Sequence, residues 1–158
     1  MNESDKLRKQ IAAVLGWGEA HQTLDAVVAD FPPELRGVRP QGLPHSAWEL
    51  LEHIRIAQWD MLEFSRDPKH VSPEFPKGYW PPTPAPPSEK AWDESIDKYK
   101  ADRAEFEKLI LDPKNDLTAP IPHADGQTLL REALLTADHT SHHLGQLILV
   151  RRLLGAWK

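Results

Sequence analysis

The chain contains no cysteine among its 158 residues. This absence excludes disulfide bonds, thiolate metal sites and a thiol nucleophile, so a bound metal would need histidine, aspartate, glutamate or water as ligands. No apolar run approaches the roughly 20 residues of a membrane-spanning helix. The polar, acidic start Met1-Asn2-Glu3-Ser4-Asp5 lacks the apolar core of a signal peptide. We therefore expect a cytoplasmic protein with no membrane partner.

Basic residues are outnumbered by acidic ones: the chain has 19 Lys and Arg against 24 Asp and Glu, which gives a net charge of −5. A mildly acidic chain without a basic stripe argues against a nucleic-acid partner. Apolar residues make up 40% and charged residues 27%, as in ordinary globular proteins. A chain of this length is typical of one domain with a real core, so we expect a single domain over residues 1–158.

Strand patterns of useful length and internal repeats are absent, whereas apolar residues recur at helical spacing in several segments. The predicted helices cover residues 4–15, 19–31, 46–65, 88–111 and 128–154, and the sequence leaves open whether the first two form one bent helix or two. Ser4 and Ser88 are predicted caps, and Ser46 with Glu49 forms a capping box. The 15 prolines cluster between these segments. We predict an all-α four-helix bundle with a long Pro-rich crossover between helices 2 and 3.

Two histidines, His139 and His143, are four residues apart in the last predicted helix and therefore lie on one face. Both border the apolar face, where bare imidazoles need partners. A third histidine, His53, lies at a similar depth on the capped helix 46–65. Three neutral imidazoles would leave a metal ion with open positions, which is the catalytic arrangement. Such a set suits zinc, nickel, iron or copper alike.

Several rival sites lack their signatures. The zincin motif would need Glu where Thr140 stands, and no histidine has a glutamate three residues before it, as a ferritin-like di-iron site requires. No Cys-x-x-Cys-His motif is present for attached haem. The residue types allow a Ser-His-Asp triad, but no Gly-x-Ser-x-Gly motif accompanies them.

Other residues have weaker links to this site. Glu49 is four residues before His53, and a carboxylate there could accept the far ring N–H or serve only the capping box. Asp138 has the same relation to His142, which we interpret as structural or as a pocket wall. Tyr79 and Trp80, in the crossover, either rim a pocket mouth or form a lid over the core.

Gln146 is either a polar pocket group or a helix-surface residue. His21 either faces the site or is a partly buried histidine without a role. The remaining histidines lie in predicted loops and receive no role: His45, His70 and His123.

Four motifs resemble the DinB/YfiT-like superfamily of metalloenzymes over nearly the whole chain. They are Gly18-Glu19-Ala20-His21, His45-Ser46-Ala47-Trp48-Glu49-Leu50-Leu51-Glu52-His53-Ile54, Gly78-Tyr79-Trp80-Pro81, and Ala137-Asp138-His139 through His143-Leu144-Gly145-Gln146 with Arg151-Arg152 following. The resemblance implies a bundle with up-down-down-up topology, often dimeric. It also implies a divalent metal ion, typically nickel, zinc or iron, bound by His53, His139 and His143. His142 stands where close relatives are expected to carry an aromatic residue.

The resemblance gives a reaction only by analogy. Characterised relatives include thiol S-transferases and a mycothiol-dependent maleylpyruvate isomerase. We therefore expect a metal-dependent enzyme acting on a small molecule, as a low-molecular-weight-thiol S-transferase or a related transferase or hydrolase, and a homodimer. The alternative is a non-catalytic module that binds a small ligand or metal in a stress response. No residue is assigned as the general acid or base.

Overall fold

The computed structural model describes residues 2–157. It contains five α-helices and two 3₁₀ turns: α1 (Glu3–Val14), α2 (Leu24–Val28), η1 (Pro33–Leu35), α3 (Ala47–Arg66), η2 (Lys77–Tyr79), α4 (Ala91–Leu111) and α5 (Leu129–Leu153). Within this range there is no β-strand, only one isolated bridge between Pro120 and Thr128. The all-α prediction is confirmed.

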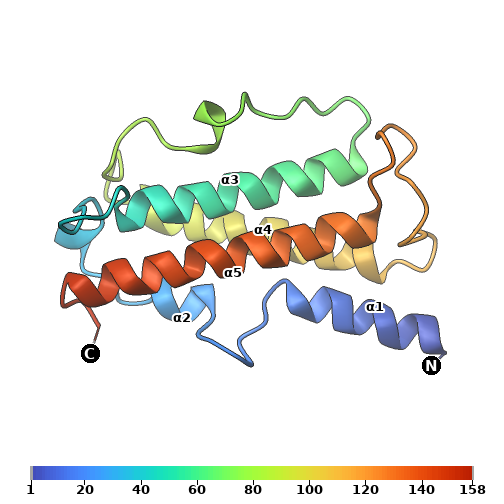
Figure 1. The fold of residues 1–158 in the computed structure, drawn as a ribbon, viewed down its shortest axis with the longest axis horizontal. Coiled ribbons are helices and arrows are strands. Elements are labelled where there is room, and N and C mark those ends of the chain that lie inside the picture. Colours follow the sequence, from blue (N-terminus) through green and yellow to red (C-terminus); the bar gives the residue numbers. More distant parts are fainter. Residues whose placement is uncertain (1, 158) are drawn as a thin grey trace.

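The long helices form a bundle in which α3 and α4 run in the same direction and α1 and α5 run in the opposite one (Figure 1). Helix α3 packs against both α4 and α5, and α1 packs against α4 and α5 on the other side. The chain between α3 and α4 returns along the full length of the bundle. This crossover gives the expected up-down-down-up order. None of the helices in residues 2–157 has the length and apolarity needed to cross a bilayer.

The predicted helix starts are confirmed for α3 and α5 and wrong for α1 and α4. Ser46 and Glu49 form the expected capping box, and the Thr128 hydroxyl accepts from the Arg131 amide. Helix α1 begins earlier than Ser4, because Asn2 and Asp5 form their own capping box. At α4 the Ser88 carbonyl, rather than its hydroxyl, accepts from the Ala91 amide. A backbone turn therefore replaces the side-chain cap, and α4 starts at Ala91.

The first helical region consists of two helices. Residues 15–23 separate α1 from α2, in keeping with the low helix propensity of Gly16 and Gly18. Thr23 then caps α2, which lasts only five residues. The predicted helix 19–31 was thus too long at both ends.

Two apolar clusters fill opposite ends of the bundle. One joins α2 to the start of α3 and the end of α5 and includes Phe31, Leu51 and Leu147. The other joins α1 to the ends of α3 and α4 and the start of α5, and includes Leu62 and Phe106. Burial of such side chains contributes on the order of 1.5–3 kcal/mol each. This packing fixes α3 and α5 side by side, and the histidines lie along their contact.

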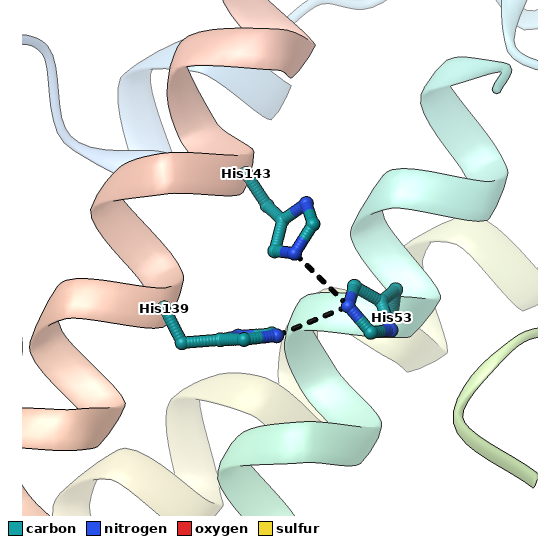
Figure 2. Close-up of side chains that lie close together, drawn as sticks. All are labelled: His53, His139 and His143. Carbon is teal, nitrogen blue, oxygen red and sulfur yellow. Dashed lines mark hydrogen bonds between the residues drawn. The ribbon is translucent and has the colours of Figure 1, made fainter. Parts of the chain in front are cut away.

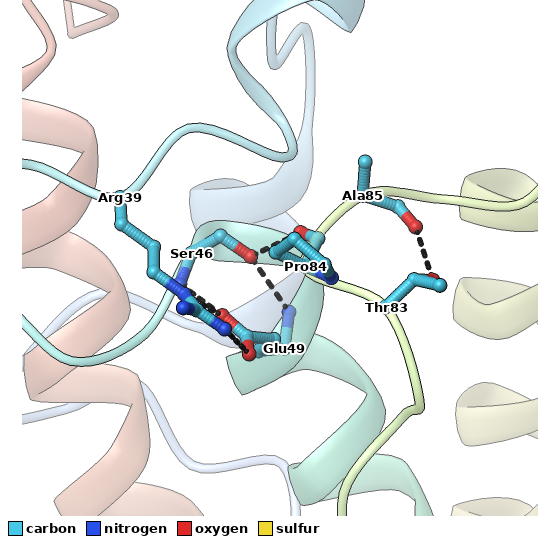
Figure 3. A network of polar contacts seen from close by, with 6 residues as sticks. All are labelled: Arg39, Ser46, Glu49, Thr83, Pro84 and Ala85. Atoms are coloured by element: carbon cyan, nitrogen blue, oxygen red, sulfur yellow. Dashed lines mark hydrogen bonds and ion pairs between the residues drawn. The ribbon is translucent and has the colours of Figure 1, made fainter.

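The crossover is held close to the start of α3 (Figure 3). The Ser46 hydroxyl donates to the Pro84 carbonyl. Gly37 lies so close to Ala85 that a Cβ atom on the glycine would be 2.4 Å from the alanine Cβ. Only glycine therefore fits at this contact, which brings the crossover within reach of the histidine-bearing part of α3.

Candidate metal centre

Three histidine side chains from two helices converge (Figure 2). The Nε2 atom of His53, on α3, lies 3.0 Å from Nε2 of His139 and 3.0 Å from Nε2 of His143, both on α5. One ring nitrogen from each residue lies within 4.8 Å of the other two. His139 and His143 share a face because they are one helical turn apart, and the packing of α3 on α5 places His53 opposite them. We call these residues the histidine triad.

Burial keeps these imidazoles neutral. It lowers the pKa of His53 to about 4 and that of His139 to about 3, and it also lowers the pKa of His143. His53 is only 8% exposed, and the other two are half-buried. The mutual proximity of the rings acts in the same direction. A neutral imidazole presents one nitrogen lone pair, which is what a metal ligand requires.

Two of the rings have their other nitrogen occupied. His53 Nδ1 lies 2.9 Å from the Tyr79 carbonyl, which accepts only, so Nδ1 carries the proton. His143 Nδ1 lies 2.7 Å from the Gln146 side-chain oxygen and donates in the same way. In both residues the lone pair is therefore on Nε2.

The resulting arrangement fits a cation. The unprotonated Nε2 atoms of His53 and His143 face each other at 3.0 Å with no proton to share. Two facing lone pairs repel unless a positively charged group lies between them. The donor set is three imidazoles with no carboxylate, and the described residues hold no further His, Cys, Asp or Glu in the group. Imidazole nitrogens suit zinc, nickel, iron and copper, and three protein ligands leave coordination positions open.

An aromatic stack covers His53. The Trp80 ring lies parallel to the His53 ring at 3.9 Å, and His45 stacks on the other side of Trp80 at 4.0 Å. Sequence analysis gave His45 no role because it lies outside the helices. The sequence did contain one signal for this position. His45 directly precedes Ser46, and a capped helix start fixes the position of the residue before it.

Tyr79 bridges the triad to a buried carboxylate. Its carbonyl accepts from His53, and its hydroxyl donates to Asp60 at 2.6 Å. His70 binds the other oxygen of Asp60 at 2.7 Å. Burial raises the pKa of Tyr79 to about 12, so the hydroxyl stays protonated and donates. We call Asp60, His70 and Tyr79 the crossover clasp, because two of its members lie in the crossover and one lies on α3.

The clasp was only partly visible in the sequence. Tyr79 was predicted at a pocket rim, and the structure brings it and Trp80 against His53. Asp60 is seven residues after His53, so it lies two helical turns further along the same face of α3. An acidic residue on a buried face needs a polar partner, and this signal could have linked Asp60 to the site. Nothing local marks His70, because its contact depends on how the crossover folds.

The remaining predicted residues differ in their distance from the triad. Gln146 contacts it directly through His143, whereas His142 is exposed and meets the His143 ring edge-on at 4.8 Å. Glu49 gives its carboxylate to Arg39 and to the Ser46 amide, not to His53 (Figure 3). His21 bonds Ser141, on the face of α5 turned away from the triad.

Comparison with known proteins agrees with this architecture. The family model of the DinB superfamily matches residues 17–147, which include α2 to α4, most of α5 and the whole histidine triad. No curated protein and no solved structure gave a significant match. The family match covers most of the chain, so this protein belongs to the DinB superfamily.

Proposed function

We propose that this protein is a divalent-metal-dependent enzyme whose ion is held by His53, His139 and His143. The observation that carries the proposal is the convergence of three imidazole nitrogens, two of which face each other as unprotonated lone pairs at 3.0 Å. Three neutral ligands leave the full charge of the ion in place, which favours Lewis-acid chemistry over a purely structural role.

The surrounding residues hold this ligand set in position. The Tyr79 carbonyl and the Gln146 amide fix the tautomers of His53 and His143, and Trp80 holds the His53 ring plane. Such partners keep the ligating nitrogen aimed and raise its basicity. A divalent ion bound there would lower the pKa of a water or thiol on its open positions and so supply a nucleophile at neutral pH.

The finer assignments rest on resemblance to the superfamily. We propose nickel, zinc or iron as the ion and a low-molecular-weight thiol as co-substrate, with transfer favoured over hydrolysis of a small molecule. A cytoplasmic homodimer is part of the same proposal. No side chain is assigned as general acid or base, because Asp60, the carboxylate of the clasp, is fully engaged by Tyr79 and His70.

Elemental analysis of untagged protein tests the metal site. We expect about one ion per chain in the native protein and none in the variant His53→Ala/His139→Ala/His143→Ala. Equal metal content in the two proteins would contradict the triad. Loaded protein is then tested for thiol transfer with its own metal. Turnover supports the enzyme, and full loading without turnover of any thiol or hydrolysable substrate would favour the non-catalytic alternative.

A further inference from the structure

A small cavity lies about one helical turn from the histidine triad, along the contact between α3 and α5. Leu50 lines it from α3, three residues before His53, and Gln146 lines it from α5, three residues after His143. The two helices run in opposite directions (Figure 1), so both offsets point to the same end of the bundle. Three residues of helix rise about 4.5 Å. The cavity is therefore a neighbour of the converging imidazoles and not a separate place on the surface.

Two residues that line this cavity also hold the triad in place. The Gln146 side-chain oxygen accepts from Nδ1 of His143 at 2.7 Å. His45 stacks at 4.0 Å on Trp80, which in turn stacks at 3.9 Å on His53. The cavity and the triad therefore share supporting side chains on both the α3 and the α5 side.

The cavity has an apolar floor and an accessible mouth. Leu50 and Val150 form the floor and are each 1% exposed. At the mouth, Leu149 is 45% exposed, so its side chain offers apolar surface that a ligand can cover. The residues of the mouth are all exposed or half-buried: Leu43, Pro44, His45, Gln146 and Leu149.

The lining of the cavity carries no full charge. Among residues 2–157, no Asp, Glu, Lys or Arg side chain lines it. Burial lowers the pKa of His45, so this ring is neutral at pH 7. The charges that act on His45, those of Arg39 and Glu49, are paired with each other at 2.5 and 2.8 Å. An ionised ligand group would lose water here without gaining a partner, so the cavity favours an uncharged group.

The size of the cavity limits what it can hold. Its volume is about 60 Å³, and a space of roughly 10–15 Å³ holds one water molecule. It therefore accommodates a group of about four non-hydrogen atoms, the size of a butyl chain. A protein partner would need a far larger surface, roughly 800 Å² on each side. Part of a small molecule is the occupant that fits.

We propose that this cavity is the substrate subsite of the metal centre and that it binds a short, uncharged alkyl group. The substrate class is then a small molecule with a metal-binding end, such as a thiol, and a compact apolar end. The inference rests on the proposed function, because the reactive end of the same molecule has to reach the ion. Gln146 serves both ends: its oxygen fixes the tautomer of His143, and its side chain forms part of the subsite.

Isothermal titration calorimetry of the metal-loaded full chain tests the subsite with ethanethiol, 1-hexanethiol and 6-mercaptohexanoate. Each buried methylene strengthens binding about fourfold. Even partial burial of the four extra methylenes should therefore make 1-hexanethiol bind about tenfold more tightly than ethanethiol, or better. 6-Mercaptohexanoate has the same number of carbons but an ionised end, and it should lose most of this gain.

The outcomes separate the subsite from the metal centre. Equal affinities for ethanethiol and 1-hexanethiol would overturn the subsite and leave the metal centre standing. No binding of any of the three thiols would defeat the proposed metal chemistry, and the subsite with it. A 6-mercaptohexanoate affinity equal to that of 1-hexanethiol would contradict the uncharged character of the subsite.

A variant that fills the cavity locates the effect. Leu149→Trp should lower the affinity for 1-hexanethiol to about that for ethanethiol and leave ethanethiol unchanged, because the indole occupies the mouth. The matched control Leu134→Trp alters another α5 leucine, 50% exposed and outside the cavity, and should change neither affinity. Unchanged 1-hexanethiol binding in Leu149→Trp, or equal weakening of both thiols, would overturn the subsite.

Discussion

The two sides of α5 show how one helix supports two kinds of polar surface. On the side facing α3, His139 and His143 are neutral, and together with His53 they share a small space. On the opposite side, behind α5, Arg103 forms ion pairs with Asp25 and Glu107 at 3.4 and 3.7 Å. Burial explains the neutrality of the triad, because it lowers the pKa of imidazoles whose ordinary value is near neutrality. Neutral lone pairs favour a bound cation, whereas the charges on the opposite side already pair with one another.

The largest expected effect comes from removing one ligand. His143→Ala should abolish stoichiometric metal binding and leave the helical circular dichroism spectrum largely unchanged, because the ring is half-buried at the helix surface. The exposed His123, whose Nε2 atom lies 2.7 Å from the Phe64 carbonyl near the end of α3, provides the control variant His123→Ala, which should keep the metal. Full metal occupancy in His143→Ala, measured by elemental analysis, would contradict the assignment of metal binding to the side of α5 that faces α3.

Removing the metal should come next in size. A ligand at a hundred times its dissociation constant stabilises the folded state by about 2.7 kcal/mol. For a chain of this length that corresponds to a shift of roughly 5–10 °C in unfolding temperature. Calorimetry of loaded and chelated protein measures it. The triple histidine variant should show no shift on chelation, and a native protein with the same unfolding temperature in both states would argue against ligands spanning α3 and α5.

A smaller effect is expected from the crossover clasp. Tyr79→Phe keeps the carbonyl on His53 but loses the hydroxyl that Asp60 holds at 2.6 Å, so the carbonyl is less well fixed. Outer partners of metal ligands typically contribute tenfold or more to affinity, so we expect about a tenfold loss. Thr83→Val, which removes an exposed hydrogen bond within the crossover, is the control. Competition against a chelator of known affinity measures both, and equal losses would mean that loop order in general, not the clasp, sets the affinity.

The last expected effect concerns pH, and it applies to the metal-free protein. In the metal-free protein the pKa values of His53 and His139 are about 4 and 3, against about 6.5 for unfolded histidine. Between these values the unfolded chain binds more protons, so the free energy of unfolding should fall as pH drops from about 6.5 towards 4. Above pH 6.5 the contribution is constant. Urea unfolding at pH 7 and pH 5 measures the difference, which should be larger in native protein than in the triple histidine variant.

The helices that carry the triad were readable from the sequence because their signals are local. The Ser46–Glu49 box and Thr128 mark where α3 and α5 begin, and four-residue spacing places His139 and His143 on one face. The start of α4 was misplaced at Ser88 because a hydroxyl near a helix start caps it only if the backbone presents it, and here a turn intervenes.

The contacts made by the crossover were not readable. Tyr79 and Trp80 were predicted at a pocket rim or lid, but the stacking of His45 on Trp80 and the contact of His70 with Asp60 were not. A Pro-rich connection has no periodicity that would reveal which side faces inward. A cavity behind α5, lined by Trp17, His21 and Ser141, was equally hidden. His21 was considered only for the metal, because the separation of α1 from α2 that creates the cavity was left undecided.

The Tyr79 carbonyl on His53 also has a consequence for the order in which the protein matures. His53 is separated by 86 and 90 residues from its two partners and by 26 from the carbonyl that orients it. An unfolded chain brings such distant groups together rarely, so it should bind an ion far more weakly than the native bundle. Uptake of the ion would then report that the crossover has docked and α5 has packed, so that only chains which have finished folding become loaded.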